Sequence, residues 1–169
     1  MQEGGYMAKS DSRVEAITMA MDAEKEAHNY YTQAAQKTTN SKGKDMFHQL
    51  AAFELSHYNN LKSLLDSLNE DKGWIQYAGT QFPDSSEHTE GESSSSEEET
   101  KDDTLSILSK AIEDEKKASE YYNKLADKTD DPSGKAMFRK LAEEEKLHTK
   151  ILNDQWYSLN NKGVWIWGD

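Results

Sequence analysis

Apolar residues recur at alternating spacings of three and four along four stretches of the chain, which is the repeat of one face of an α-helix. These stretches show no alternation of period two, which a half-buried β-strand would require. The pattern therefore predicts an all-α protein with four long amphipathic helices. The inward-facing positions of the successive helices are Ile17, Met21, Glu24, His28, Tyr31 and Ala35; then Phe47, Leu50, Glu54, His57, Leu61, Leu64 and Leu68; then Leu108, Ile112, Glu115, Ser119, Tyr122 and Ala126; and finally Phe138, Leu141, Glu145, His148, Leu152, Gln155 and Leu159.

Local signals place the ends of these helices. Ser12 and Glu15 form a capping box that should start the first helix, which we expect to end near Thr39. Gly43 belongs to the turn before the second helix, expected at about 44–69.

The second pair of helices has equally clear boundaries. The third helix should begin after Asp103. Asp131 is placed to cap the fourth helix, with Pro132 as its first residue.

The lengths of the connections predict the topology. Short turns make each pair of helices an antiparallel hairpin, at 11–69 and at 104–160. The linker at 70–103 is long enough to cross a helix of about 25 residues, or about 37 Å, and to start the third helix parallel to the second. Two hairpins with one long crossover predict a single ferritin-like four-helix bundle over residues 1–169.

The crossover divides into two parts of different composition. The aromatic part at 73–83 should pack along the bundle, and the tail at 161–169, which contains two tryptophans, should also pack. Residues 84–103 carry nine acids and one lysine, so −8 of the net charge of −12 lies there. This Ser-rich segment should be disordered. A solvated linker is the favoured interpretation, with a loose cation collector or a phosphorylatable segment as alternatives.

Composition narrows the function classes further. The chain has no cysteine, which excludes disulfides, thiolate chemistry and iron–sulfur clusters, so any metal must be held by His and carboxylate. Outside the acidic linker the chain is only mildly acidic, which argues against nucleic acid as a partner. The sequence contains neither a membrane-length apolar run nor a signal peptide, and we expect a cytoplasmic protein.

The two halves of the chain are copies of one another. Residues 20–64 align without a gap with residues 111–155, and 18 of the 45 pairs are identical. Core positions and polar positions are duplicated together, so both halves should fold alike.

The repeat carries a recurring pair of metal-ligand types. Glu54 and His57 are three residues apart on the inward face of the second helix, and Glu145 and His148 repeat them on the fourth. This spacing lets one metal take a carboxylate oxygen and an imidazole nitrogen together. The matching inward positions of the first and third helices are also acidic, at Glu24 and Glu115.

Four carboxylates in an apolar core would be strongly unfavourable unless they were neutralised. Two divalent cations would balance them, which predicts a carboxylate-bridged dinuclear centre. Tyr31 and Tyr122 lie on the same faces and could donate hydrogen bonds to the glutamates or take part in catalysis as redox-active groups beside the ligands, although plain core tyrosines are an equal alternative.

Other polar aromatic residues receive weaker predictions. His28 could reach the rim of the site, but its repeat partner is Ser119. Tyr30 and Tyr121 should be packing residues, and the two histidines without repeat partners, His48 and His88, should be solvated.

At these residues the chain resembles the di-iron domain of the rubrerythrin family, including the crossover at Phe82 and Pro83. The resemblance implies two iron ions, with Zn or Mn as possible substitutes. It also implies that Glu54 and Glu145 bridge the metals and that the terminal ligands are Glu24, His57, Glu115 and His148.

The chain departs from the family pattern in two ways. Rubrerythrins usually carry a rubredoxin module, for which this chain has no cysteines, and they often place an extra carboxylate where Ala118 stands. We therefore expect an external electron donor such as a rubredoxin-like protein, and a homodimer. The resemblance implies reduction of hydrogen peroxide or dioxygen. The alternatives are ferroxidase or iron-handling activity, and a metal-binding bundle without catalysis.

Overall fold

The computed structural model describes residues 6–81 and 101–168, with side chains described from residue 12 onward. All regular secondary structure in these ranges is α-helical. None of the described helices is both long and apolar enough to span a membrane. The four helices are α1 (Tyr6–Lys37), α2 (Ser41–Asn69), α3 (Lys101–Lys128) and α4 (Pro132–Lys162).

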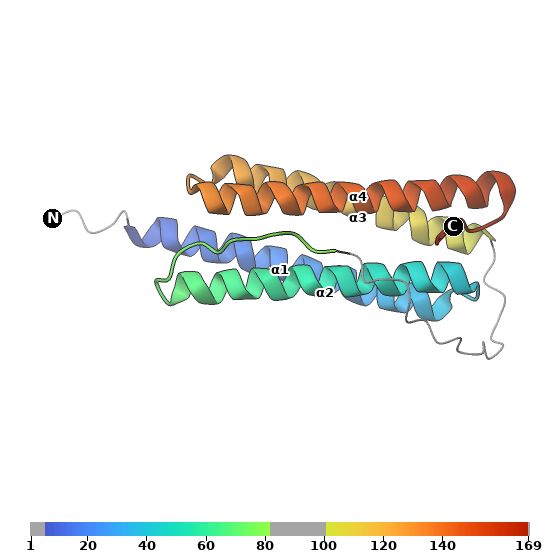
Figure 1. Cartoon of the computed structure of the whole chain (residues 1–169), viewed down its shortest axis with the longest axis horizontal. Helices are drawn as coiled ribbons and strands as arrows, with labels where there is room; N and C mark the ends of the chain where they lie inside the picture. Colours follow the sequence, from blue (N-terminus) through green and yellow to red (C-terminus); the bar gives the residue numbers. More distant parts are fainter. Residues whose placement is uncertain (1–5, 82–100, 169) are drawn as a thin grey trace.

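The helices form two antiparallel hairpins, α1 with α2 and α3 with α4, that lie against each other (Figure 1). The described part of the crossover, residues 70–81, runs back along the bundle, and α2 and α3 run in the same direction (Figure 1). Contacts within each hairpin are much denser than those between α1 and α3. This arrangement confirms the predicted all-α bundle with one long crossover.

The predicted starts of the first and third helices are wrong. α1 begins at Tyr6, so Ser12 lies inside the helix instead of capping it. Residues 6–11 contain no Gly or Pro that would end the helix. α3 begins at Lys101, and Asp102 and Asp103 lie in its first turn, where negative charge favours the helix dipole.

The second helix also begins earlier than predicted, at Ser41, so Gly43 lies inside α2 and not in the turn before it. Asn40 caps α2 and accepts hydrogen bonds from the backbone N–H groups of Lys42 and Gly43, at 3.0 Å and 3.3 Å. The Asp131 side chain caps α4, and Pro132 is its first residue, as predicted. Gly163 ends α4 in the left-handed conformation, with φ of 69°.

The repeat extends beyond the aligned segment to two tryptophans. Trp165, which follows α4, packs edge-on against Phe47 of the other hairpin, with ring centroids 5.9 Å apart. Trp74, which is 91 residues earlier and follows α2, packs in the same way against Phe138, also at 5.9 Å. Each tryptophan therefore packs against the other hairpin, close to the turn that joins its two helices. The contact of Trp165 confirms that the tail packs on the bundle.

The packing of the crossover along the bundle is confirmed for its described part. Ile75 and Tyr77 pack against the core cluster of buried residues at one end of the bundle. Phe82, Pro83 and the acidic segment lie outside the described residues.

Tyr30 and Tyr121 do more than pack. The Tyr30 hydroxyl on α1 donates to the carbonyl of Ile107 on α3, and the Tyr121 hydroxyl on α3 donates to the carbonyl of Ala16 on α1, both at 2.8 Å. These two bonds join the hairpins symmetrically on either side of the bundle centre.

Replacing Gly43 with Ala should lower the free energy of unfolding. A Cβ at Gly43 would lie 2.6 Å from the Trp165 ring and 2.8 Å from the Thr38 methyl group. Overpacking of this kind costs about 1–3 kcal/mol, which exceeds the gain of about 1 kcal/mol that Ala ordinarily brings to a helix. Urea unfolding of Gly43→Ala, alone and together with Trp165→Ala, measures the difference. A Gly43→Ala protein more stable than the parent would contradict the tight packing.

Candidate metal centre

Six side chains predicted from the repeat converge near the middle of the bundle. One comes from each of α1 and α3, and two come from each of α2 and α4, where they lie three residues apart on the inward face. Each is at most 4% exposed. The six are Glu24, Glu54, His57, Glu115, Glu145 and His148.

His57 is the centre of the first half of this cluster. Its Nδ1 atom lies 3.1 Å from Glu145 Oε1, 3.2 Å from Glu54 Oε2 and 3.4 Å from Glu24 Oε1. One ligand atom from each of these four residues lies within 4.8 Å of the others. The group could therefore hold a metal ion.

His148 is the centre of the matching second half. Its Nδ1 atom lies 3.0 Å from Glu54 Oε1, 3.2 Å from Glu145 Oε2 and 3.4 Å from Glu115 Oε1. These four residues form a second group with ligand atoms within 4.8 Å. Glu54 and Glu145 belong to both groups, which is the placement expected of bridging carboxylates.

The donor set fits a pair of divalent cations. Glu54 Oε2 and Glu145 Oε2 are buried and accept no hydrogen bond from the described residues. Buried carboxylate oxygens of this kind are rare because they have lost hydration without a replacement. Oxygen and imidazole donors suit iron, zinc and manganese, and two divalent ions would balance the four carboxylates.

Tyr31 and Tyr122 are hydrogen-bonded to glutamates of the cluster, and each bond crosses between the hairpins. Tyr31 on α1 donates to Glu115 on α3 at 2.5 Å, and Tyr122 on α3 donates to Glu24 on α1. Burial, together with the charge of the neighbouring glutamates, raises the pKa of both phenols well above the ordinary value. Both hydroxyls therefore stay protonated and act as donors that orient the carboxylates.

Comparison with known proteins agrees with this site. The rubrerythrin family profile matches residues 14–98 and 106–164, which is most of the chain. The chain belongs to the rubrerythrin family. Among solved structures it is similar to the hypothetical protein Pfu-1136390-001 from Pyrococcus furiosus, with a TM-score of 0.68 and 26% identity over 88% of this chain and 90% of that one. No curated protein matches it.

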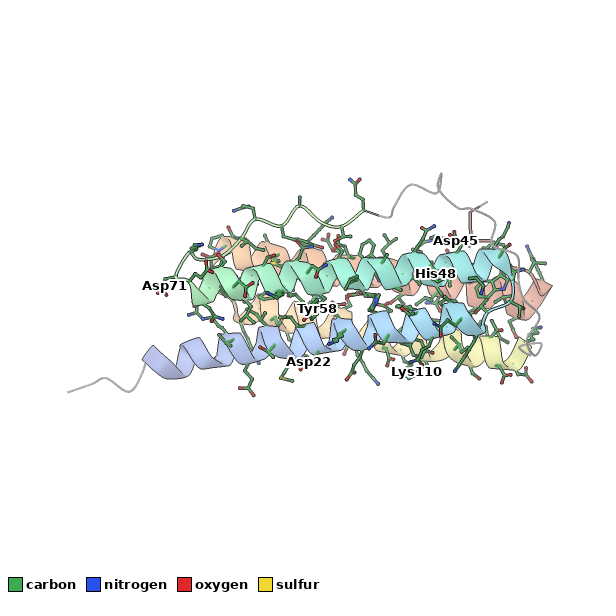
Figure 2. The ribbon with its side chains drawn as sticks, turned by 90° about the horizontal axis from the view of Figure 1, so that it is seen from below. Asp22, Asp45, His48, Tyr58, Asp71 and Lys110 are labelled. Atoms are coloured by element: carbon green, nitrogen blue, oxygen red, sulfur yellow. The ribbon has the colours of Figure 1, made fainter. Side chains whose placement is uncertain are left out.

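This rubrerythrin-family protein has an open cavity that reaches the cluster. The cavity has a volume of about 500 Å³ and lies between α1 and α3, where the hairpins make few contacts. All four glutamates of the cluster line its inner end, and exposed charged residues, including Lys110, line its mouth. Figure 2 labels Lys110 beside α1, where its ammonium group lies 4.6 Å from the centre of the Tyr30 ring. The walls are built from the repeat pairs Ala20 and Ala111, Ala27 and Ala118, and Tyr30 and Tyr121.

The other described histidines, His28 and His48, do not belong to the two groups of candidate ligands. His28 Nδ1 is hydrogen-bonded to the carbonyl of Ala51 at 2.7 Å, and its repeat partner Ser119 donates to the carbonyl of Ala142 at 3.0 Å. The His28 side chain therefore joins α1 to α2, and the suggested position at the rim of the site stays a prediction. His48 is exposed on α2 (Figure 2), and His88 lies outside the described residues.

Sequence reasoning missed one residue of the site, Glu144. Its carboxylate lies 3.0 Å from His57 Nε2, on the other nitrogen of the imidazole that faces the cluster. Glu144 lies one residue away from the inward position of Glu145, so helical periodicity does not place it at the site. A mismatch in the repeat was the available signal, because the corresponding residue of the first half is Phe53.

Without bound cations, the four glutamates divide into two kinds. Burial raises the pKa of Glu54 to about 8, together with the charges of Glu115 and Glu24, and burial and neighbouring carboxylates raise the pKa of Glu145 as well. Burial also acts to raise the pKa of Glu115 and Glu24, but the neighbouring histidines outweigh it. His148 lowers the pKa of Glu115 to about 2, and His57 lowers the pKa of Glu24 below its usual value.

The two imidazoles respond in the opposite sense to burial. Burial lowers the pKa of His57 and His148, but the adjacent glutamates outweigh it and raise both values well above normal. The metal-free cluster therefore holds protons in the positions where cations would bind.

In the metal-free protein, lowering the pH from about 8 towards about 5 should raise the free energy of unfolding. Glu54, Glu145, His57 and His148 have raised pKa values in the folded state, so the folded protein binds more protons than the unfolded chain in this range. One net unit of pKa difference corresponds to about 1.4 kcal/mol, or roughly 3–6 °C in melting temperature for a chain of this length. Thermal melts across the pH series measure the effect.

Below about pH 4.5 the trend should reverse, because the lowered pKa values of Glu24 and Glu115 favour folding only while these groups stay ionised. The metal-loaded protein should lose stability on mild acidification, since protons compete with metal for the ligands. A metal-free melting temperature that drops steadily from about pH 7 to about pH 5.5 would argue against clustered carboxylates.

Substitutions of the shared glutamates and of the histidines should affect metal content differently. Glu54→Ala and Glu145→Ala should each disturb both metals, because each glutamate belongs to both groups. His57→Ala and His148→Ala should each weaken mainly one metal. Metal analysis after equilibrium dialysis should find the glutamate variants well below two metals per chain and the histidine variants near one. If all four variants lose one metal and retain the other, the two sites are independent.

Proposed function

We propose that this protein is a non-haem di-iron oxidoreductase that reduces hydrogen peroxide or dioxygen with electrons from a separate donor. The observation that carries the proposal is the combination of a buried dinuclear ligand set with an open cavity leading to it. A metal pair that served only to hold the bundle together would need no such opening. A site that turns over a small oxidant must admit the oxidant and release water.

The cavity suits a small oxidant in size and in lining. Its volume of about 500 Å³ exceeds what peroxide or dioxygen needs, and its walls are mainly alanine methyl groups and tyrosine rings. Ala118 stands where the family often places an extra carboxylate, and its repeat partner Ala27 is equally small. These two small side chains keep the inner end of the cavity open towards Glu24 and Glu115.

Two ferrous ions bound by the cluster would supply the two electrons that convert one peroxide and two protons into two water molecules. The protein positions the ligands for this chemistry. Tyr31 and Tyr122 hold Glu115 and Glu24 by hydrogen bonds, and the raised pKa values of the two phenols keep the hydroxyl protons in place. The surrounding side chains leave Glu54 and Glu145, the two glutamates shared between the ligand groups, only 1% exposed.

The proposed cycle needs an electron source outside the 169 residues, because they contain no cysteine to hold a second iron centre of the rubredoxin type. We propose a rubredoxin-like protein as the donor. Ferroxidase activity is the second candidate, and the observation that favours it is the symmetry of the set of six residues, with Ala118 in place of a seventh carboxylate. A ferroxidase would release ferric iron and accept fresh ferrous iron in each cycle.

Anaerobic loading with ferrous iron, followed by mixing with peroxide or air in a stopped-flow spectrometer, tests the proposal. We expect two ferrous ions per chain to be oxidised by one peroxide, with retention of both irons. A chemical reductant should then permit repeated turnover of peroxide without further iron. Continued consumption of added ferrous iron far beyond two per chain would favour the ferroxidase. Binding of iron without oxidation by either oxidant would refute both functions.

A variant that fills the cavity provides the control for access. Ala118→Trp should slow oxidation at least about tenfold, which is about 1.4 kcal/mol in the barrier, while two metals still bind. Lys116→Trp adds the same bulk at an exposed position of α3 that does not line the cavity, and it should react like the parent protein. Equal rates in the two variants would show that the oxidant enters elsewhere.

A further inference from the structure

The two imidazoles of the centre are held differently, although the repeat makes their ligand faces alike. His57 Nε2 lies 3.0 Å from Glu144 Oε2. Glu144 is 6% exposed, and its two oxygens are held by the crossover. The Thr80 backbone N–H donates to Oε1 and the Tyr77 hydroxyl donates to Oε2, both at 2.6 Å.

An aromatic ring stands at the corresponding place beside His148. Phe53 occupies the repeat position of Glu144 and is 2% exposed. It lies edge-on to both imidazoles, with ring centroids 4.4 Å from His148 and 4.9 Å from His57. The repeat position of Tyr77 is Gly168, which has no hydroxyl group to donate. Both imidazoles therefore pack against Phe53, and His57 is in addition bonded to the carboxylate of Glu144.

This difference changes what each imidazole offers to a cation. In His57 the Nδ1 atom faces the cluster and the Nε2 atom faces Glu144. A carboxylate on Nε2 keeps the proton on that nitrogen, leaves the Nδ1 lone pair directed at the cation and increases its basicity. Carboxylates in this position change metal affinity about 10- to 100-fold in other proteins.

We infer that Glu144 makes the two metal positions unequal, so that the position next to His57 binds a divalent cation more tightly and fills first. The inference rests on the proposed metal centre but not on its redox activity. Glu144 is a positioning residue, since it contacts the imidazole nitrogen on the side away from the four glutamates of the cluster. Through Tyr77 and Thr80 the same contact ties the crossover to the tighter position.

The inference can be tested by titrating the metal-free protein with Co²⁺ alone. Calorimetry measures the affinity of each binding step, and visible absorbance monitors the bound ions. The parent protein should bind two ions in two steps whose affinities differ at least about tenfold. Glu144→Gln keeps the shape but removes the charge, and it should weaken the tight step by about 10- to 100-fold. The absorbance of the first ion bound should change, while the weak step should keep its affinity. Glu143→Gln, which changes the exposed neighbour, should titrate like the parent.

Two histidine variants assign the steps. His57→Ala should remove the tight step and His148→Ala the weak one. Two steps of equal affinity in the parent, or equal weakening of both steps in Glu144→Gln, would overturn the role of Glu144 and leave the metal centre standing. Failure of the parent to bind two ions would instead refute the metal centre. A melting temperature of metal-free Glu144→Gln close to that of the parent would show that the affinity change does not come from unfolding.

Discussion

The central constraint on this structure is the presence of four carboxylates inside the apolar core of a helical bundle. Buried like charges are unfavourable unless cations, protons or hydrogen-bond donors compensate for them. The side chains around the cluster supply protons and hydrogen-bond donors. His57 and His148 each place a ring nitrogen among the glutamates, and the two buried tyrosines donate hydrogen bonds to Glu24 and Glu115. The oxygens that accept no hydrogen bond belong to the two glutamates shared between the ligand groups, where divalent cations would provide the compensation.

The compensation is arranged so that neither hairpin completes its own half of the site. Tyr31 donates to the glutamate of the other hairpin, and Tyr122 returns the same bond. Trp74 and Trp165 are exchanged in the same way at the two ends of the bundle. Direct contacts between α1 and α3 are few, so these exchanged side chains hold the hairpins in register. The weak contact between α1 and α3 also leaves the cavity open, and access to the site therefore follows from how the bundle is assembled.

The crossover breaks this symmetry. It follows α2, and the tail after α4 matches it at Trp165 and Ile166, which correspond to Trp74 and Ile75 of the crossover. Beyond that point the crossover continues to Tyr77 and Thr80, which bind Glu144 and through it one of the two histidines. A cluster of candidate metal ligands built from a duplicated half-site is thus given two different surroundings by the connection between the halves. Such a difference can set an order of filling that the duplicated ligands alone would not produce.

Helical periodicity and the internal repeat determined most of the fold and the six converging residues, because a side chain's direction from a helix follows from its position in the sequence. The same rule could not place Glu144, which lies one residue from the inward position, nor pair Tyr31 with Glu115, since those contacts depend on how two hairpins dock. The predicted start of α1 at Ser12 was also wrong, because a capping motif is only a local preference and the helix extends through it to Tyr6. Tertiary structure alone decided the partners across the hairpins, the open cavity and the inequality of the two imidazoles. Each of these depends on the distance between helices that are far apart in the sequence.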